Sequence, residues 1–521
     1  MAEQFRVTYA TMSADDEQLH KAYDEGIEKA RAELGQYHPA VVNGEERRGE
    51  GTYELRSPID KDIVLGTFAQ VSRQDVDDAV AAAKAFALEW DRMGWRRRVE
   101  LIRKTADIIS ERRNELAALM ALEVGKSRLE ALGDVEETAD LMRWNAREVE
   151  EHNGFEEPMQ SMGASGRYID VMRPYGVWGV ISPFNFPMAL SGGPSSAALV
   201  TGNVVVFKPS NQGAMLGYKL YECYRDAGIP PGAFHYLPGR GPVAGDAIVH
   251  HPDVAGITFT GSYEVGMGIY KGFATDVPKP IICEMGGKNP TIVTKNADLD
   301  KATDGVMRSA FGYSGQKCSA NSRVYVEREV YDEFVDKLRE KTEKIKVGNP
   351  LDKDVYLGPV INDAAVQRFE EASNEAKKNG RVITGGERIA EGDLARGNFV
   401  APTVVEVPTD SWIWRKELFV PFVSVAPIDS LDEGLKLANE TEYGLTAGFY
   451  SEDEAEQQEF LDRIEAGVVY VNRRAGATTG AWPGVQPFGG WKGSGTTGKA
   501  GGGPYYVLQY MREQSRTVIE E

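Results

Sequence analysis

One cysteine of this chain lies in a setting that favours chemistry over packing. Cys318 belongs to the segment 314–320 (SGQKCSA), which is small, polar and typical of a turn. Thiolate is the reactive form of cysteine, and we expect the ammonium group of the adjacent Lys317 to favour it. Cys223 and Cys283 lie among apolar residues and are most simply core. Two interpretations of Cys318 stay open: a nucleophile, or an unreactive thiol in a turn.

A thiol nucleophile needs a base, and no histidine stands close to Cys318 in sequence. Glu284 is the candidate, because it follows the apolar run 280–283 and precedes the flexible Met285-Gly286-Gly287. Burial at a strand end would raise the pKa of its carboxyl group toward that of a useful general base. The alternative is a helix cap or an ion-paired carboxylate.

Asn185 is an amide enclosed by aromatic rings and prolines in the segment 183–187 (PFNFP), at the end of a predicted strand. An amide NH₂ group fixed there could donate a hydrogen bond to a developing oxyanion. The alternative is ordinary turn chemistry, for which asparagine is common.

Two glycine-rich turns are candidates for holding a phosphate. Residues 239–244 (GRGPVA) follow a predicted strand and satisfy the pattern G-x-G-x-x-G/A, and residues 259–266 (FTGSYEVG) also join a strand to a helix. Free backbone N–H groups and the helix dipole favour an anion at such points. The first turn alone is equally consistent with a plain tight turn, but two turns in consecutive βαβ units favour a dinucleotide.

Lys208 closes the apolar run 204–207, which places a cation at the carboxyl end of a strand. Ligands bind at that edge of open α/β sheets. Pro209 and Ser210 make an ordered turn there, so we expect a contact to a ribose or phosphate, with a plain surface lysine as the alternative.

These residues need a parallel sheet to bring them together. Short apolar runs alternate with helical stretches, which predicts βαβ units and two α/β domains in series. The expected strands are 177–181, 204–207, 234–237, 256–259, 280–283, 401–405 and 467–471, and the expected helices include 330–346 and 363–379. Apolar residues at three- and four-residue spacing also predict one long helix over 99–123, ended by Gly125.

Composition excludes several functional classes. The 521 residues carry a formal net charge of −20, which repels nucleic acid and anionic lipid, so neither is an expected partner. No apolar stretch reaches the roughly 20 residues of a membrane-spanning helix. Three scattered cysteines and six histidines lack CxxC or HxxxH spacing, so no metal is predicted. The first residues lack the features of a secretion signal, and we expect a cytoplasmic protein.

Taken together, the segments resemble the aldehyde dehydrogenase superfamily from about residue 40 to the end of the sequence. Seven motifs occur in the family's order and spacing. They are residues 183–187, 208–210, 259–266, 284–288, 315–319, 417–419 and 486–490.

The resemblance implies a role for each candidate. Cys318 would be the nucleophile, Glu284 the general base and Asn185 the oxyanion donor in a cycle that passes through a thiohemiacetal and a thioester. Hydride would go to NAD. The implied cofactor contacts are Pro183, Phe184, Lys208, Ser210, Gly241, Gly261, Ser262, Gly266, Glu417 and Phe419.

Two departures from the family pattern concern the cofactor. Asn211 stands where an acidic residue is common three positions after the ribose lysine, which removes a repulsion against a 2′-phosphate and leaves NADP admissible beside NAD. Val420 replaces a usual glycine beside Phe419 and is expected to reshape that loop.

Within the family, residues 311–320 and 494–505 look most like the branch that oxidises L-glutamate γ-semialdehyde, formed from 1-pyrroline-5-carboxylate, to L-glutamate in proline catabolism. The implied substrate contacts are Phe186, Ser319, Gly480, Ala481 and Phe488. Some members have serine at the position of Ala481. Another small semialdehyde, or aldehydes in general, remain the alternative substrates.

The implied fold is α/β, with a Rossmann-like NAD-binding domain, an α/β catalytic domain and a small β flap for oligomerisation. The expected boundaries are an irregular arm (1–50), the NAD-binding domain (51–154 and 175–287), the flap (155–174 and 503–521) and the catalytic domain (288–502). A homo-oligomer is expected, with a separate proline dehydrogenase as a further candidate partner.

Overall fold

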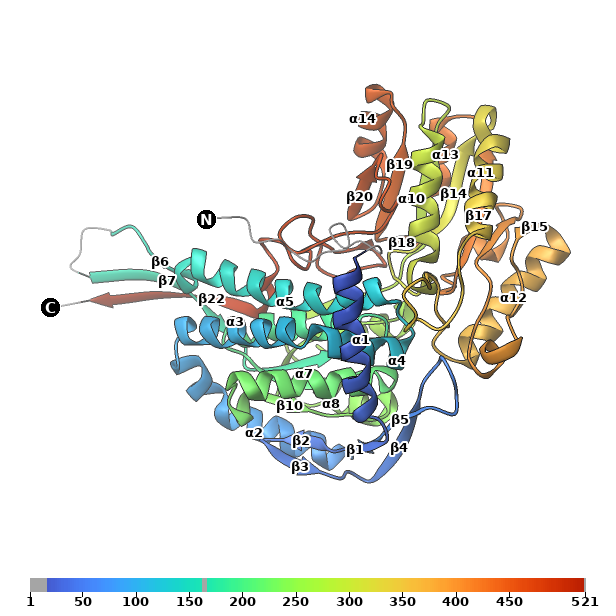
Figure 1. Cartoon of the computed structure of the whole chain (residues 1–521). Coiled ribbons are helices and arrows are strands. Elements are labelled where there is room, and N and C mark those ends of the chain that lie inside the picture. The colour runs from blue at the N-terminus through green and yellow to red at the C-terminus, as the bar shows by residue number, and fades with distance from the viewer. Residues whose placement is uncertain (1–15, 162–165, 520–521) are drawn as a thin grey trace.

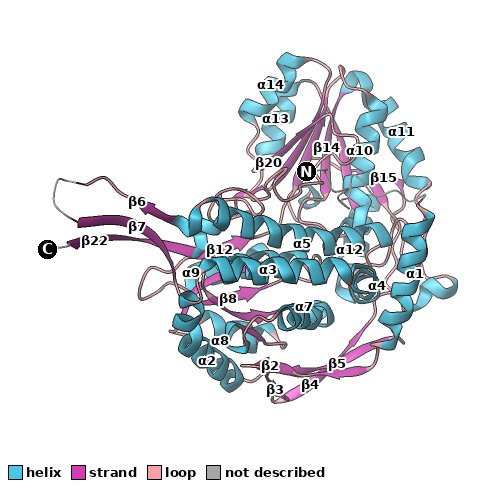
Figure 2. Cartoon of the chain, turned by 60° about the vertical axis from the view of Figure 1, so that its left-hand side comes forward, coloured by secondary structure: helices cyan, strands magenta, loops and turns pink. Residues whose placement is uncertain are grey.

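Two large sheets organise the chain in the computed structural model, which describes residues 16–161 and 166–519. In Figure 1 the blue-to-green part of the chain builds the lower body, and the yellow-to-red part builds the upper one. Helices lie against the strands of both sheets (Figure 2). This is the expected α/β class.

The first large sheet contains the five expected parallel strands side by side, and two further short strands extend it at one edge. Its spatial order is β12 (Ile281–Glu284), β11 (Val254–Thr260), β8 (Val177–Ile181), β9 (Val204–Lys208), β10 (Phe234–Tyr236), β2 (Ala40–Val42) and β3 (Glu45–Arg47). The chain runs from β8 through β9 to β10 and then crosses to β11 on the other side of β8. The strand order therefore reverses between β8 and β11, where open α/β sheets bind ligands.

Eight helices accompany this sheet in the described residues. They are α2 (Arg73–Arg92), α3 (Trp95–Glu111), α4 (Arg113–Val124), α5 (Arg128–Glu151), α6 (Ala189–Val200), α7 (Ala214–Ala227), α8 (Asp246–Val249) and α9 (Tyr263–Gly272).

The prediction of one long helix over 99–123 was wrong, because α3 and α4 are separate helices that meet at Arg112. The apolar stripe is interrupted there, with no buried residue between Ile109 and Leu116. The predicted stop is confirmed: Gly125 ends α4 with φ +77°, a left-handed conformation that glycine adopts without strain.

The prediction of an irregular arm was also wrong for its described part. Asp16 caps helix α1 (Glu17–Ala32), which packs on α4. After α1 come β1 (Gln36–His38), β2 and β3, and β1 joins a small sheet with β4 (Gly51–Arg56) and β5 (Val64–Gln70). Strands of three residues are too short to show alternation in sequence. Residues 1–15 of the predicted arm lie outside the described residues.

The second large sheet is parallel except at one edge strand. Its spatial order is β15 (Arg381–Thr384), β16 (Thr403–Glu406), β17 (Phe422–Ile428), β14 (Asn321–Glu327), β13 (Asn289–Val293), β19 (Thr446–Tyr450) and β20 (Val468–Val471). Its helices are α10 (Leu299–Phe311), α11 (Tyr331–Glu343), α12 (Asp363–Asn379), α13 (Leu431–Asn439) and α14 (Glu454–Arg463). A two-stranded ladder joins β18 (Tyr443–Gly444) to β21 (Trp491–Lys492).

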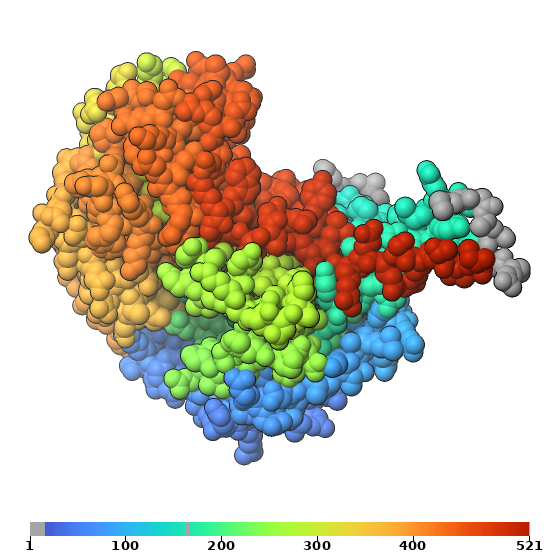
Figure 3. Space-filling view, turned by 180° about the vertical axis from the view of Figure 1, so that it is seen from behind, coloured from blue at the N-terminus to red at the C-terminus, as the bar shows by residue number. Residues whose placement is uncertain are grey.

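A three-stranded arm projects from the body (Figures 1 and 3). It consists of β6 (Glu156–Pro158), β7 (Gly166–Pro174) and β22 (Met511–Ile519). The last two pair antiparallel along their whole length, from Met511 opposite Pro174 to Ile519 opposite Gly166. Segments far apart in sequence therefore form one ribbon.

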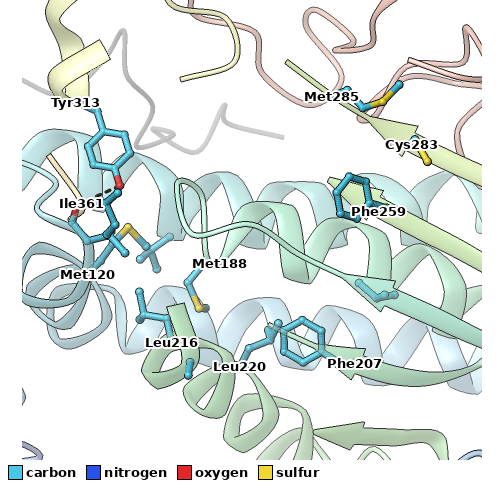
Figure 4. Packing of buried hydrophobic residues seen from close by; sticks show 14 of the residues in the cluster. Met120, Met188, Phe207, Leu216, Leu220, Phe259, Cys283, Met285, Tyr313 and Ile361 are labelled. Atoms are coloured by element: carbon cyan, nitrogen blue, oxygen red, sulfur yellow. Dashed lines mark hydrogen bonds between the residues drawn. The ribbon is translucent and has the colours of Figure 1, made fainter. Parts of the chain in front are cut away.

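The larger apolar core extends from the first sheet into the second, where a smaller cluster adjoins it, and it includes two of the three cysteines. Cys223 and Cys283 are buried, as expected for core thiols. Figure 4 shows Phe259, Cys283 and Met285 near one another at the ends of β11 and β12. No helix among the described residues combines the length and apolar character needed to cross a bilayer.

Candidate active site

Two cavities meet at Cys318. A cleft of about 890 Å³ lies at the carboxyl ends of the first sheet, and a second cavity of about 370 Å³ lies behind it. Thr260, Met285 and Cys318 line both. The thiol therefore stands where the contents of one cavity can react with the contents of the other. We refer to them as the cofactor cleft and the aldehyde cavity.

The turn before Cys318 has an unusual backbone. Tyr313, Ser314 and Gly315 are all left-handed, with φ of +48°, +54° and +66°. The Tyr313 hydroxyl donates to the carbonyl of Val124 (3.0 Å), and Ser314 Oγ donates to the carbonyl of Gly358 (2.7 Å). Such conformations cost free energy outside glycine and persist only where surrounding contacts hold them.

The expectation that Lys317 favours a thiolate at Cys318 was wrong. Its ammonium group pairs with Glu130 Oε1 at 2.7 Å. Burial, followed by the carboxylates of Glu417 and Glu284, raises the pKa of Cys318 to about 12. The sulfur is therefore a thiol at neutral pH and needs a group that accepts its proton.

Glu284 ends strand β12 and lines the aldehyde cavity with Cys318. Burial raises the pKa of its carboxyl group to about 8, against a backbone hydrogen bond from Gly490 that lowers it. Its Oε2 atom is buried and has no hydrogen-bond partner among the described residues. Neither the predicted alternative of a helix cap nor that of an ion pair accounts for this oxygen.

Asn185 follows strand β8 and is 3% exposed. It lines the cofactor cleft together with Cys318. The amide therefore lies on the side of the thiol that faces the carboxyl ends of the parallel strands.

Nine of the ten predicted cofactor residues line the cofactor cleft. They are Pro183, Phe184, Lys208, Ser210, Gly241, Gly261, Ser262, Glu417 and Phe419. Gly266 does not, because it lies on α9 against Met285, whose sulfur would be 2.5 Å from a Cβ at this position. Gly266 therefore permits close packing behind the cleft wall.

One end of the cleft suits a phosphate-containing ligand. Ser262 caps α9 by accepting a hydrogen bond from the Val265 N–H. The Lys208 ammonium is buried and donates to the carbonyl of Pro209, and burial lowers its pKa to about 8. Asn211 presents a buried Oδ1 without a hydrogen-bond partner among the described residues. The start of α9 and the Lys208 ammonium offer N–H donors and a cation to an anion, and the Asn211 oxygen can accept from a hydroxyl group beside it.

The other end of the cleft is enclosed by the loop after the 3₁₀ helix η8 (Trp412–Trp414). Glu417 Oε1 accepts from the N–H of Gly287 (3.0 Å), and Phe419, at φ +57°, lies edge-on to Phe184 with ring centroids 5.9 Å apart. Val420 is buried, and its carbonyl would be 2.3 Å from a Cβ at Gly315. The departure at Val420 thus lies directly on the turn that leads to Cys318. Both ends of the cleft fit a dinucleotide.

All five predicted substrate residues line the aldehyde cavity: Phe186, Ser319, Gly480, Ala481 and Phe488. Arg473 holds the loop that carries two of them, donating to the carbonyl of Thr479 at 2.6 Å. Gly480 has φ +117°, and a Cβ there would be 2.3 Å from the Arg473 guanidinium. Thr478 Oγ1 also donates to the carbonyl of Ser319 (2.7 Å). The loop is thereby bound to the segment that follows the thiol.

Apart from Glu284 and Lys317, sequence reasoning missed the charged residues of the aldehyde cavity. They are Arg128, Glu130, Glu137, Arg308, Lys353, Asp354 and Arg473. The first three lie on α5 and the others on different helices and loops, where each resembles an ordinary solvated charge. Among the described residues no group of three or more His, Cys, Asp or Glu side chains could hold a metal ion.

Comparisons with known proteins agree with this geometry. The model of the aldehyde dehydrogenase family matches residues 45–516. A protein of Geobacillus sp. (strain WCH70) named 1-pyrroline-5-carboxylate dehydrogenase is 38% identical over 508 residues, covering 96% of each chain.

Solved structures give the same result. A 1-pyrroline-5-carboxylate dehydrogenase from Thermus with bound NAD superposes with a TM-score of 0.93 at 32% identity, covering 100% of both chains. Proline utilization A from Bdellovibrio bacteriovorus superposes with a TM-score of 0.91 at 37% identity. That match covers 96% of the present chain and 52% of the other, so this chain spans about half of that protein.

Proposed function

The chain belongs to the aldehyde dehydrogenase family, and from that premise we propose that it oxidises L-glutamate γ-semialdehyde to L-glutamate with NAD, as a step of proline catabolism. The observation that carries the proposal is the place of Cys318 between the two cavities. An aldehyde carbon bound to this sulfur from the aldehyde cavity faces the cofactor cleft. The choice of substrate follows the names of the similar proteins described above, which are 1-pyrroline-5-carboxylate dehydrogenases.

NAD, when bound, supplies a hydride acceptor at its nicotinamide ring. On this proposal Lys208 and Ser262 hold its adenosine and pyrophosphate end. Glu417 and Phe419, which line the cleft with Cys318, would hold its nicotinamide riboside. The enclosure of this end by Phe184 and Phe419 excludes water while the aldehyde is oxidised.

The first half-reaction forms a bond between Cys318 Sγ and the aldehyde carbon. The thiol proton passes to a base, for which Glu284 is the assigned group, and the carbonyl oxygen becomes an oxyanion. Asn185 donates its side-chain N–H to that oxyanion, which stabilises charge as it develops. Loss of hydride from the carbon leaves a thioester on Cys318.

The second half-reaction hydrolyses the thioester. Glu284 first releases the thiol proton to solvent. It then removes a proton from water, the water oxygen bonds to the acyl carbon, and the carbon–sulfur bond breaks as the sulfur takes the electron pair. The carboxylic acid leaves and the sulfur recovers its proton. A carboxyl pKa near 8 suits this exchange, because the group can both accept and return a proton near neutral pH.

Recognition of the amino acid end of the substrate is assigned to the far side of the aldehyde cavity. The Ser319 hydroxyl and the backbone of Gly480 and Ala481 hold the α-carboxylate, and Phe186 and Phe488 flank the short carbon chain. With alanine at 481, one side-chain hydrogen bond found in related enzymes is replaced by backbone contact.

The division into domains also belongs to this proposal. Residues 51–154 and 175–287 form the NAD-binding domain, which takes in the strands at 40–47, and residues 288–502 form the catalytic domain. Residues 155–174 and 503–521 form a flap through which the chain makes a homo-oligomer, and a separate proline dehydrogenase supplies the substrate. The protein is expected in the cytoplasm.

A panel of aldehydes tests the function. Purified protein is mixed with NAD and, in turn, L-glutamate γ-semialdehyde, other short semialdehydes and plain aliphatic aldehydes, and reduced cofactor is followed by absorbance. We expect the amino acid semialdehyde to give the highest kcat/KM. Equal efficiency with aliphatic aldehydes would overturn the substrate but not the family chemistry.

A further inference from the structure

A buried lysine that has no part in the proposed mechanism lies next to the loops of the candidate active site. Lys126 is fully buried in the turn between α4 and α5, and its Nζ donates to Asp134 Oδ2 at 2.8 Å. The same Nζ lies 3.4 Å from the ring centroid of Phe186 and 4.8 Å from that of Tyr313. One ammonium group therefore contacts a carboxylate and two aromatic rings.

The two rings belong to the two loops that carry the proposed reacting groups. Phe186 is the next residue after Asn185, and Tyr313 opens the left-handed turn that leads to Cys318. The rings meet edge-on, with centroids 6.4 Å apart. Lys126 thus bridges a loop of the first sheet and a loop between two strands of the second.

Asp134 fixes the other end of the first loop. Its Oδ1 accepts a hydrogen bond of 2.8 Å from the N–H of Ala189, and Ala189 is the first residue of α6. The loop of Asn185 is consequently held at Phe186 by the cation and at Ala189 by the carboxylate. Neither Lys126 nor Asp134 lines either cavity.

A buried ion pair is weak as a stabilising device, because its attraction barely offsets the loss of hydration. An ammonium group held away from water against aromatic faces is more useful for orientation, since the contact is stronger there than at a surface. Catalysis is sensitive to such orientation, as a displacement of about 1 Å can cost ~100-fold in rate.

We propose that Lys126 is a positioning residue that sets the spacing between the Asn185 amide and the Cys318 thiol by binding Phe186 and Tyr313 at once. The proposal rests on the function proposed above. Lys126 touches neither substrate nor cofactor and acts only through the two loops.

The test compares three variants of the full chain. Lys126→Met/Asp134→Asn removes both charges together, so no lone charge is buried, and the introduced amide oxygen can still accept from the Ala189 N–H. Lys126→Arg keeps the cation. Lys219→Met is the matched control, because Lys219 is also a buried, ion-paired lysine, bound to Glu33 and Glu222, and lines neither cavity.

The measurements are the single-turnover burst of reduced cofactor at saturating aldehyde, the Kd for NAD and the thermal unfolding midpoint. We expect the double variant to lose ~10- to 100-fold in burst rate while its Kd for NAD changes by less than about twofold. Lys126→Arg should recover most of the lost burst rate. The burst rate of Lys219→Met should stay within about twofold of that of the parent, even if its unfolding midpoint falls as far as that of the double variant.

A double variant that bursts as fast as the parent overturns the proposal. So does a control that loses as much burst rate as the double variant, since the effect would then follow stability. If the double variant does not fold, Lys126→Gln alone decides, because its amide can still donate to Asp134 but places no cation against the two rings. An unchanged burst there overturns the proposal, and a slowed burst with unchanged NAD affinity supports it. Failure of the proposed function is distinct, because the parent itself would then show no burst with any aldehyde.

Discussion

The cofactor cleft and the aldehyde cavity share Cys318 but are built differently. Most of the cleft comes from residues 181–286, as successive strand ends and turns of one sheet. The aldehyde cavity draws on α5, α6, the loop at 353–356 and the segment 473–506. A contiguous stretch of sequence therefore encodes the cofactor side, and distant segments assembled by folding encode the substrate side.

This difference predicts that substitutions in the two cavities should have different effects on the enzyme's selectivity. Substitutions in the cleft should affect all aldehydes alike and discriminate between cofactors. Apart from the general base Glu284, substitutions in the aldehyde cavity should discriminate between aldehydes and leave cofactor affinity unchanged. Substitution of a residue that lines both cavities should reduce the oxidation of every aldehyde with either cofactor.

The largest effect is expected for Cys318→Ala, which removes the group shared by both cavities. Aldehyde oxidation should fall by ~10³-fold or more, because no covalent intermediate can form. NAD affinity should stay near that of the parent, as measured by fluorescence titration. Appreciable turnover of the purified variant would show that the shared position does not carry the chemistry.

Glu284→Gln should separate the two half-reactions. Steady-state turnover should drop by ~10²-fold or more, while a thioester accumulates on Cys318 and appears as a mass increase. The isosteric Gln keeps the cavity shape, so the loss reports the proton acceptor. An undiminished steady-state rate would assign the base elsewhere.

The same carboxyl group sets an expected pH dependence. Its pKa is raised to about 8, so the unprotonated base form increases as pH rises through that value. Deacylation in the parent should therefore accelerate from pH 6 to about 8 and level off above it. In Glu284→Gln this rise should vanish, and its persistence would point to a different titrating group.

Ser319→Ala sharpens the comparison on the aldehyde side. The kcat/KM for the amino acid semialdehyde should fall by ~10- to 100-fold, because a charged group loses a buried hydrogen bond. An aldehyde of equal length without the α-carboxylate should be little affected, and Ala481→Ser should preserve the original preference. An equal loss for both aldehydes would place Ser319 away from substrate recognition.

The smallest effect is expected for Asn211→Glu, on the cofactor side. A carboxylate beside Lys208 should repel a 2′-phosphate and reduce NADP use by ~10-fold, with NAD use changed by less than about threefold. Competing titrations of the two cofactors measure this. A parallel loss for both would place residue 211 away from the ribose.

The comparison also explains what the sequence could predict. Strand ends with polar residues after them, such as Lys208 and Glu284, carry a local signal, and five strands of the first sheet and the two glycine-rich turns followed from local pattern. The remaining cofactor-side residues, among them Glu417 and Phe419, followed from the resemblance. The substrate residues followed from a resemblance and not from spacing. Arg473 and Lys126 gave no local signal, because their roles depend on contacts with segments far away in sequence.

The errors have the same origin. Lys317 was expected to activate its neighbour in sequence, yet folding turns it toward Glu130. The strands at 36–47 were missed because each has only three residues, too few to show alternation, and because β1 and β2 also pair with the later strands β5 and β10. Local pattern is reliable where the local sequence makes the contact, and it fails where a distant segment does.

The pairing of β7 with β22 has a consequence for biosynthesis. Gly166–Pro174 leaves the ribosome long before Met511–Ile519, and its full-length neighbour in the arm is that late strand. In the interval one of its edges presents unpaired backbone N–H and C=O groups, which are a template for strands of other nascent chains. Synthesis of Met511–Ile519, and not the folding of the earlier body, therefore ends the period in which this segment is prone to aggregation.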